Sequence, residues 1–282
     1  DAYLANDWNT LPMAARAATT NNAALVIDLH EYAPLQYMEG PDQEKQRRLV
    51  RYTISKYIPK VSSSITVAGT FALRYNEEFG FFPGVIMNAP ERITLPEPAI
   101  NPSSIKLMYH GVVSRGRNPE LMIETIARCD ERYSLHLMLI PNEYIVELKN
   151  LADRIAPNRV FFHDPVPPEK ILERIAEFDV GLSIFPPVNY SSFATLPNKF
   201  FDYICAGLAV CIGPSPSSVE LVEKYGVGVI SDTFDPDDIA SALNRTSADR
   251  WISMRQASRY ASRELNAGIE MKKLINIFDR LL

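Results

Sequence analysis

The sequence predicts an α/β protein with two domains, each built on a parallel β-sheet that is covered by helices. Short apolar runs alternate with segments of helical periodicity along most of the 282 residues, which is typical of doubly wound, Rossmann-like sheets. A proline-rich stretch without periodicity, residues 88–104, divides this alternation in two. Leu208–Ile212 is an uninterrupted apolar run, as expected of a parallel strand that is covered on both faces.

The composition narrows the class of protein. An apolar content of 46% with 22% charged residues is typical of a soluble globular chain, and the net charge of -5 argues against nucleic-acid binding. No signal peptide and no membrane-spanning apolar run is recognisable, so we expect a cytoplasmic protein. The scattered Cys129, Cys205 and Cys211 predict core packing in a reducing compartment rather than disulfides. The four histidines lie far apart in the sequence, so no metal site is expected.

The first domain is predicted to span residues 1–90. It opens with a strand at Asp1–Asn6 and has no initiator methionine, so we expect this domain to be partial: either an N-terminal portion with further strands is missing, or the chain is a shortened version of its fold. The further elements predicted, in chain order, are a helix at 10–19, a strand at 23–29, a helix at 42–57, a strand at 64–68, a helix at 71–75 and a strand at 85–87.

Polar residues end the second predicted strand, at Asp28, His30 and Glu31. Parallel strands deliver side chains to a ligand crevice at this point, so these residues are candidates for a site. The alternative is that they only cap the strand end, because loops carry polar residues in any protein.

The predicted helix at 42–57 is basic and amphipathic, with lysine and arginine side chains between apolar Leu49, Val50 and Ile54. One interpretation is a peripheral contact with an anionic membrane surface. The other is an ordinary covering helix with a solvated basic face, which Glu44 favours.

Residues 91–104 are predicted to be a linker, 105–264 the second domain and 265–282 a C-terminal helix that packs back on the first domain. The strands predicted in the second domain are 105–109, 135–140, 160–162, 180–184, 208–212 and 227–230. The helices are 119–129, 143–155, 168–177, one that begins near Pro197, and 217–225; the last helix follows a polar stretch.

Two loops of this domain are candidates for phosphate binding. His110–Asn118 carries Gly111 and Gly116, which let a backbone approach a ligand, and Arg115 and Arg117, whose planar guanidinium groups suit phosphate. The loop is neither the dinucleotide fingerprint nor a Walker loop, so a nicotinamide dehydrogenase is not expected.

The second candidate is the start of the helix near Pro197, where Asn198, Lys199 and Asp202 cluster. A cation, an amide and a carboxylate at the positive end of a helix suit a phosphate with an attached ribose. The alternative is a solvated Lys199–Asp202 surface pair. Because both loops open at the carboxyl ends of parallel strands, Arg117 and Lys199 are predicted to converge and to neutralise a diphosphate without a metal. The stretch 163–168, HDPVPP, could wall a base at the same edge.

These residues resemble the GT-B fold glycosyltransferases of family 4, in the branch with a PNK motif. The resemblance covers nearly the whole chain. It rests on DAYLANDWNTLPMAARAA, LVIDLHEYAP and MNAP in the first half, and on YHGVVSRGRNPELMIETIARC, FFHDPVPPEKILERIAEFDVGLSIFP, LPNKFFDYICAGLAV and ELVEKYGVGV in the second.

The resemblance implies a retaining, metal-independent transfer of a sugar from a nucleoside diphosphate to an acceptor, with no cofactor. Arg117 and Lys199 would hold the diphosphate, Asp202 would bond the ribose, Asn198 and Gly111 would help to seat the donor, and Val166 would contact the base through its backbone. His30 sits where the family brings a histidine toward the transferred sugar. The acceptor would be a glycan, a lipid-linked molecule or a small molecule.

The sequence departs from the family pattern at two places in the second domain. Ala194 stands where many members have the first of two glutamates, and Val112 stands where an arginine usually follows the loop glycine. Two alternatives therefore remain open. One is a catalytically weak nucleotide-sugar-binding partner of another glycosyltransferase, and the other, with less support, is a nucleotide-sugar epimerase.

Overall fold

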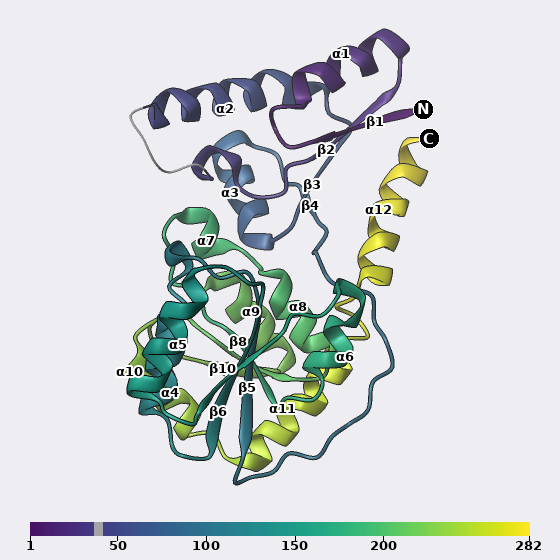
Figure 1. Cartoon of the computed structure of the whole chain (residues 1–282). Coiled ribbons are helices and arrows are strands. Elements are labelled where there is room, and N and C mark those ends of the chain that lie inside the picture. The colour runs from purple at the N-terminus through teal and green to yellow at the C-terminus, as the bar shows by residue number, and fades with distance from the viewer. Residues whose placement is uncertain (37–41) are drawn as a thin grey trace. The chain divides into compact units, whose positions relative to one another are not determined.

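The computed structural model describes residues 1–36 and 42–282 and divides them into two compact units (Figure 1). Unit 1 consists of residues 1–88, 187–196 and 267–282, and unit 2 of residues 89–186 and 197–266. The segment 187–196, which the sequence analysis included in the domain 105–264, therefore belongs to unit 1.

Unit 1 contains a four-stranded parallel sheet in the order β1-β2-β3-β4. Its strands are β1 Ala2–Asn6, β2 Ala24–Asp28, β3 Ser63–Thr66 and β4 Gly84–Val85. Its helices are α1 Leu11–Asn21, α2 Gln43–Tyr57, α3 Gly69–Phe79, the short α7 Tyr190–Ala194 and α12 Ala267–Leu281. The sheet brings the ends of β1 and β2 together, with Asn6 opposite Asp28.

The two late segments of unit 1 are held by specific contacts with its early part. The ring of Tyr190 lies 5.6 Å from that of Tyr32, measured between centroids, and the hydroxyl of Thr70 donates to the carbonyl of Ala194 over 3.0 Å. In α12 the buried carboxylate of Glu270 accepts a hydrogen bond from the backbone N–H of Met87 over 2.9 Å. Residues 187–196 and α12 are far in sequence from the residues that they contact. The place of 187–196 in unit 1 could therefore not be predicted from local sequence patterns.

Unit 2 is a doubly wound parallel sheet of six strands in the order β10-β9-β8-β5-β6-β7. The strands are β5 Ile105–Gly111, β6 Tyr133–Leu139, β7 Val160–His163, β8 Val180–Ser183, β9 Ala209–Ile212 and β10 Gly228–Ile230. From β5 the chain winds outward to β7 and then returns to β8 on the other side of β5. The strand order therefore reverses between β5 and β8, and ligands of such sheets bind beside this switch point.

Seven α-helices cover the described part of unit 2. They are α4 Glu120–Arg128, α5 Tyr144–Ile155, α6 Ile171–Ile175, α8 Asn198–Cys205, α9 Pro216–Tyr225, α10 Pro236–Asn244 and α11 Ala248–Ala261. The region before the last helix, which the sequence indicates only as a polar stretch, contains the two helices α10 and α11. Trp251 of α11 is fully buried and donates to the hydroxyl of Tyr133, which donates to the carbonyl of Leu243 in α10.

The proline-rich segment before β5 lies on α11 in unit 2. The guanidinium group of Arg255 donates to the carbonyl of Pro98 over 3.0 Å, and that of Arg259 donates to the carbonyl of Pro96 over 3.1 Å. Arg255 is 4% exposed and also bonds Asp179, so a buried ion pair helps to fix the segment, together with Ile100, which is buried in the core of unit 2.

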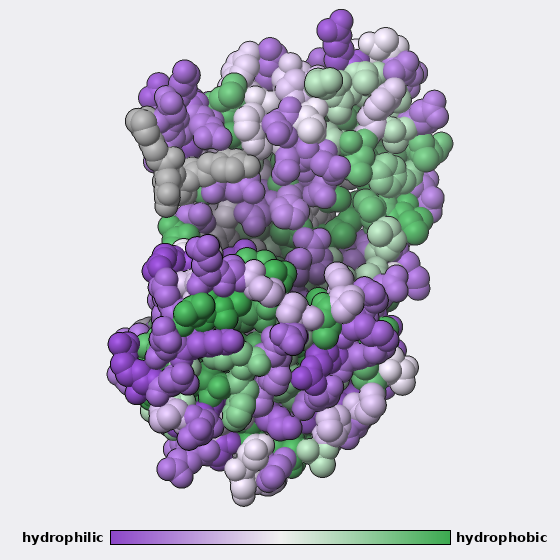
Figure 2. Space-filling model, in the orientation of Figure 1, coloured by the Kyte–Doolittle hydropathy of each residue, from purple (hydrophilic) through white to green (hydrophobic). Residues whose placement is uncertain are grey.

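Helix α2 carries the basic side chains noted in the sequence. Figure 2 shows hydrophilic side chains gathered over the N-terminal part of this helix. Arg48 pairs with Glu44 and Arg51 pairs with Glu78 of α3, so part of the positive charge is already neutralised within unit 1. Across residues 1–36 and 42–282, no helix combines the length and apolar character needed to cross a bilayer.

Candidate functional site

Two cationic elements meet at the switch point of unit 2. Arg117 lies in a single 3-10 turn, Arg115–Arg117, which follows β5, and Lys199 lies in the first turn of α8, which follows β8. The ammonium nitrogen of Lys199 is 5.2 Å from the ring centroid of Tyr109 and 5.6 Å from that of Phe185. Burial raises the pKa of Tyr109 and lowers that of Lys199, and the nearby charge of Arg117 acts to lower both. The structure thus brings Arg117 and Lys199 together.

Lys199 is an ammonium group with little to neutralise it. Its pKa is lowered to about 8, mainly by burial and also by the charge of Arg117, while Asp202 acts in the opposite direction. Within the described residues Lys199 forms no salt bridge, so the alternative of a Lys199–Asp202 surface ion pair is not supported. Its position is therefore set by the aromatic rings of Tyr109 and Phe185 through cation–π contacts.

Gly111 makes room for the Lys199 side chain. Its φ of 111° lies in the region that favours glycine. A Cβ atom at Gly111 would also come within 3.1 Å of the Lys199 nitrogen and 3.2 Å of its Cε. The sequence predicts that this glycine lets the backbone approach a ligand; in the structure it makes room for the Lys199 side chain.

Asp202 and His110 form a second part of the site, and the sequence analysis missed the histidine. His110 lies in β5, with its Nε2 atom 3.4 Å from Oδ2 of Asp202, and this buried nitrogen has no hydrogen-bond partner among the described residues. Burial lowers the pKa of His110 to about 3, so the imidazole is neutral, and burial raises the pKa of Asp202 to about 6. The sequence signal that could have identified His110 is its position as a polar residue at the end of the apolar strand β5.

The start of α8 leaves backbone donors free for a ligand. Pro197 occupies the N-cap position and provides no side-chain cap. The first hydrogen bond of the helix runs from the N–H of Phe200 to the carbonyl of Pro197 over 2.9 Å. The N–H groups of Asn198 and Lys199 precede it, so the uncapped end can accept an anion. The Asn198 side chain is exposed there.

The two arginines of the loop after β5 have different surroundings. Arg115 donates to the carboxylate of Glu147 over 2.5 Å, and its guanidinium carbon lies 4.9 Å from the ring centroid of Tyr144. Arg117 is exposed and forms no salt bridge within the described chain. Arg115 is therefore held away on α5, which leaves Arg117 as the arginine available at the switch point.

The stretch 163–168 follows β7 at the edge of the sheet. His163 makes a ring–ring hydrogen bond of 2.9 Å with His136 and packs against Phe178, so its imidazole is engaged within unit 2. Val166 is half-buried in the loop that follows. His136 and His163 are thus neighbours in space although they are far apart in sequence. In the described part of the chain, no three histidine, cysteine or acidic side chains are grouped to hold a metal ion.

His30 belongs to unit 1, at the carboxyl end of its sheet. The residue has a φ of 54°; its N–H donates to Asp28 over 2.9 Å and its carbonyl accepts from Thr66 over 2.6 Å. The Nε2 atom lies 3.5 Å from the amide nitrogen of Asn88, and the residue is exposed. The backbone is therefore fixed in a strained conformation that presents the imidazole at the end of β2.

Comparisons with known proteins place the fold. No family model matches the sequence, and neither does any curated protein. Among solved structures, HepE from Anabaena in complex with UDP is similar over 100% of this chain and 79% of its own, at 16% identity and a TM-score of 0.72. Sucrose-phosphate synthase from Thermosynechococcus elongatus is similar over 99% and 73%, at 12% identity and a TM-score of 0.75. Trehalose 6-phosphate synthase from Burkholderia multivorans is similar over 98% and 71%, at 10% identity and a TM-score of 0.67.

The predicted fold class is confirmed: the chain has the two parallel, Rossmann-like sheets of GT-B glycosyltransferases. At identities of this size the similarity establishes the fold alone. Function must therefore be argued from the residues at the site.

Proposed function

We propose that this chain is a glycosyltransferase of the GT-B, family 4 type, which transfers a sugar from a nucleoside diphosphate to an acceptor with retention of configuration and without a metal. The observation that carries the proposal is the convergence of Arg117 and the unpaired Lys199 beside the uncapped start of α8, at the switch point of the sheet. Arg117, Lys199 and the N-terminus of α8 together provide three positive groups. Such a cluster suits a diphosphate rather than a neutral ligand.

The chemistry of the transfer requires stabilisation of the leaving group. The bond between the anomeric carbon and the phosphate oxygen breaks, and negative charge develops on the nucleoside diphosphate. Arg117, Lys199 and the N–H groups of α8 would meet that charge with donors that are already in place. With a pKa of about 8, Lys199 is largely protonated at neutral pH, which this role requires.

The remaining assignments follow the resemblance. Asp202 would accept hydrogen bonds from the ribose hydroxyls, Asn198 and Gly111 would help to seat the phosphates, and Val166 would contact the base through its backbone. His30 of unit 1 would approach the transferred sugar. The HepE structures were obtained with UDP and with UDP-glucose, so uridine nucleotides are the first donors to test here.

A panel of nucleoside diphosphate sugars, screened by thermal stabilisation and then by transfer and donor hydrolysis, tests the proposal. Lys199→Ala and Arg117→Ala should each lower donor turnover by about 100-fold or more, as expected when a preorganised donor to a developing charge is lost. Arg115→Ala is the matched control, because this arginine is engaged with Glu147 and should leave turnover within about threefold. Normal transfer by both site variants would contradict the proposal.

The same experiment separates the two alternatives. A catalytically weak partner would be stabilised by the donor without turning it over. Ala194 favours this alternative, because its buried side chain has no carboxylate at the position where many family members have a glutamate. An epimerase would release an isomerised nucleotide sugar, which product analysis by NMR detects. Either result would replace the transferase assignment while keeping the donor site.

We also propose a peripheral contact between α2 and an anionic membrane, which suits a lipid-linked acceptor. Leu49 and Tyr52 of this helix are 53% and 59% exposed and lie among basic side chains. Sedimentation with vesicles of anionic lipid tests the contact, and Leu49→Glu should abolish it. No binding would show that α2 is an ordinary covering helix, and equal binding to neutral vesicles would show that the contact does not depend on anionic lipid.

A further inference from the structure

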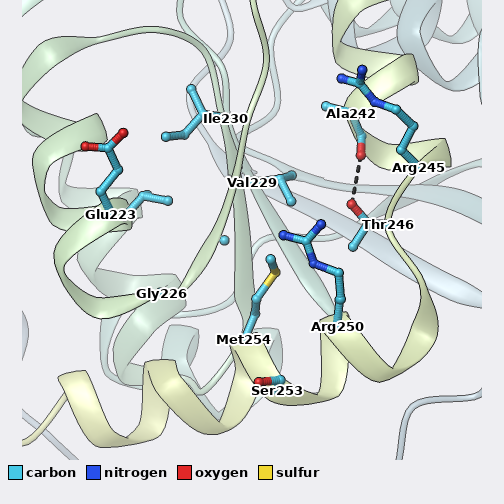
Figure 3. Close-up of a pocket in the computed structure, with 12 residues that line it drawn as sticks. Glu223, Gly226, Val229, Ile230, Ala242, Arg245, Thr246, Arg250, Ser253 and Met254 are labelled. Atoms are coloured by element: carbon cyan, nitrogen blue, oxygen red, sulfur yellow. Dashed lines mark hydrogen bonds between the residues drawn. The ribbon is translucent and has the colours of Figure 1, made fainter.

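A groove runs beside β10, the edge strand of the unit-2 sheet (Figure 3). Its volume is about 680 Å³. Its walls come from α9, from β10 itself and from the corner where α10 ends and α11 begins. Two strands, β9 and β8, separate β10 from the switch point, so the groove is distinct from the proposed donor site.

The backbone of β10 has unused hydrogen-bonding groups on the side of the groove. The strand pairs only with β9, with Gly228 opposite Val210 and Ile230 opposite Ile212. The ladder bonds in β10 belong to alternate residues, since Val227 accepts from Val210 and Ser231 donates to Ile212. Parallel strands direct the groups of the intervening residues to the other side. The N–H and C=O groups of Gly228 and Ile230 therefore face outward, and the described residues provide no backbone partner for them.

The groove carries positive charge along one wall. Figure 3 shows Arg245 and Arg250 on one side of β10 and Glu223 on the other, with Arg250 extending toward the strand above Met254. In the part of the chain that the structure describes, neither arginine side chain forms a hydrogen bond or an ion pair. By contrast, the neighbouring Thr246 hydroxyl already donates to the carbonyl of Ala242 over 2.8 Å.

These two features together define the ligand. An open strand edge binds extended backbone, and unpaired guanidinium groups bind carboxylates. A free anion would use the arginines but not the outward groups of Gly228 and Ile230. An apolar strand would use the edge but not the arginines.

We propose that the β10 groove binds an extended acidic segment of a partner protein, which adds to the sheet as a seventh strand. The added strand would exchange hydrogen bonds with Gly228 and Ile230 and would direct alternate acidic side chains toward Arg245 and Arg250. Because β10 offers only these two residues, the affinity of an isolated peptide should be modest, with a Kd on the order of 0.1 mM.

The test uses the full chain and an eight-residue peptide of alternating valine and glutamate. Fluorescence anisotropy should show saturable binding, and single-residue hydrogen exchange should slow at Gly228 and Ile230 without a change at Val229, whose N–H is already in the ladder. The combined variant Arg245→Glu, Arg250→Glu should weaken binding at least 10-fold. Arg154→Glu, on the exposed face of α5, is the matched charge control and should not.

A second variant separates strand addition from simple charge attraction. Ile230→Pro removes an outward N–H while it leaves the ladder with β9 intact, and edge strands tolerate proline at such positions. This variant should lose at least 10-fold in peptide affinity and keep the melting temperature within a few degrees and the response to a nucleotide unchanged. The proposal is wrong if the lysine version of the peptide binds equally well. It is also wrong if millimolar inorganic phosphate displaces the peptide and binds Ile230→Pro as tightly as the unaltered chain, which would indicate a small-anion site.

Discussion

The two ends of the unit-2 sheet each carry a carboxylate beside a cation, buried at one end and partly buried at the other, and the two sites are built differently. At the amino ends of the strands, Oδ1 of Asp179 lies 3.1 Å from the guanidinium group of Arg255, with side chains 9% and 5% exposed. Asp179 also accepts the N–H of Lys106 over 2.9 Å, and Arg255 donates to the carbonyl of Gly207 over 3.2 Å. Burial raises the pKa of Asp179, while these partners act to lower it.

At the carboxyl ends the groups are close but not paired. Asp202 has the neutral His110 at 3.4 Å and no salt bridge to Lys199. Burial shifts the pKa of Asp202 up and that of Lys199 down, so both charged forms are disfavoured. The first site pairs its two charges directly, although the Nη2 atom of Arg255 has no partner among the described residues, and we interpret it as structural. The second site leaves its charges unpaired, as expected of a ligand-binding site.

The largest effect is expected when the paired site is broken. Arg255→Met should lower the free energy of unfolding by about 3–5 kcal/mol, because it leaves Asp179 buried without its partner. Urea unfolding at neutral pH measures this loss. Donor affinity of the folded fraction should not change, since Arg255 lies at the opposite end of the strands. A loss below about 1 kcal/mol would show that Asp179 is solvated or protonated at that pH.

Replacement of the cation by methionine at the carboxyl ends of the strands should change the free energy of unfolding in the opposite direction. Lys199→Met removes a cation whose pKa is lowered to about 8, and it should raise the free energy of unfolding by about 1–3 kcal/mol at pH 7. The variant should also lose most of its affinity for a nucleoside diphosphate sugar. Calorimetric unfolding and donor titration measure the two quantities. A destabilised variant would mean that Lys199 is part of the packing rather than part of the site.

The pH dependence of donor binding sharpens the contrast further. In the proposed roles, Asp202 is ionised when it accepts from the ribose and Lys199 is protonated when it faces the phosphates, so donor affinity should be highest between about pH 6 and pH 8. Isothermal titration with UDP-glucose tests this, because its phosphates do not titrate in that range. Asp202→Asn should abolish the acid limb and keep the alkaline one. A flat profile in the unaltered chain would contradict the roles of both residues.

The linkage to stability has a definite sign at Asp202. Because its pKa in the folded chain is raised to about 6, the folded state binds the proton more tightly than the unfolded state. Its contribution to stability is therefore fully present below the unfolded pKa of about 4 and is lost as the pH rises through 6. Unfolding of Asp202→Asn should lack this component between pH 4 and pH 6.

Much of the fold was predictable because both sheets are parallel, and the central strands of unit 2 are short, mostly apolar runs that are buried in its core. Each strand of both sheets lies close to its predicted position. The helices α10 and α11 escaped prediction because their core-facing Ile239, Leu243 and Trp251 are interspersed with alanine and serine, and because α11 buries the polar Arg255 and Ser258. Because polar residues such as Arg255 occupy core-facing positions, the apolar periodicity by which a helix is predicted from sequence is interrupted in α11.

The candidate site divides in the same way. The convergence of Arg117 and Lys199 followed from topology alone, since loops after neighbouring parallel strands open at one edge. The engagement of Arg115 by Glu147 and the placement of His110 beside Asp202 are contacts between residues 32 and 92 positions apart in the sequence. Such contacts depend on how α5 and α8 pack, which no local pattern of residues encodes.

The smallest effect concerns how the helices of unit 2 begin. The side chain of Ser247 caps α11 by accepting from the N–H of Arg250, whereas α8 has no side-chain cap. Ser247→Ala should therefore cost about 0.5–2 kcal/mol in the free energy of unfolding, measured in urea, and leave donor affinity unchanged. If the loss of this cap also weakened donor binding, α11 and the start of α8 would be coupled. The conformation of the uncapped end of α8 would then depend on its packing against α11 rather than on a bound ligand.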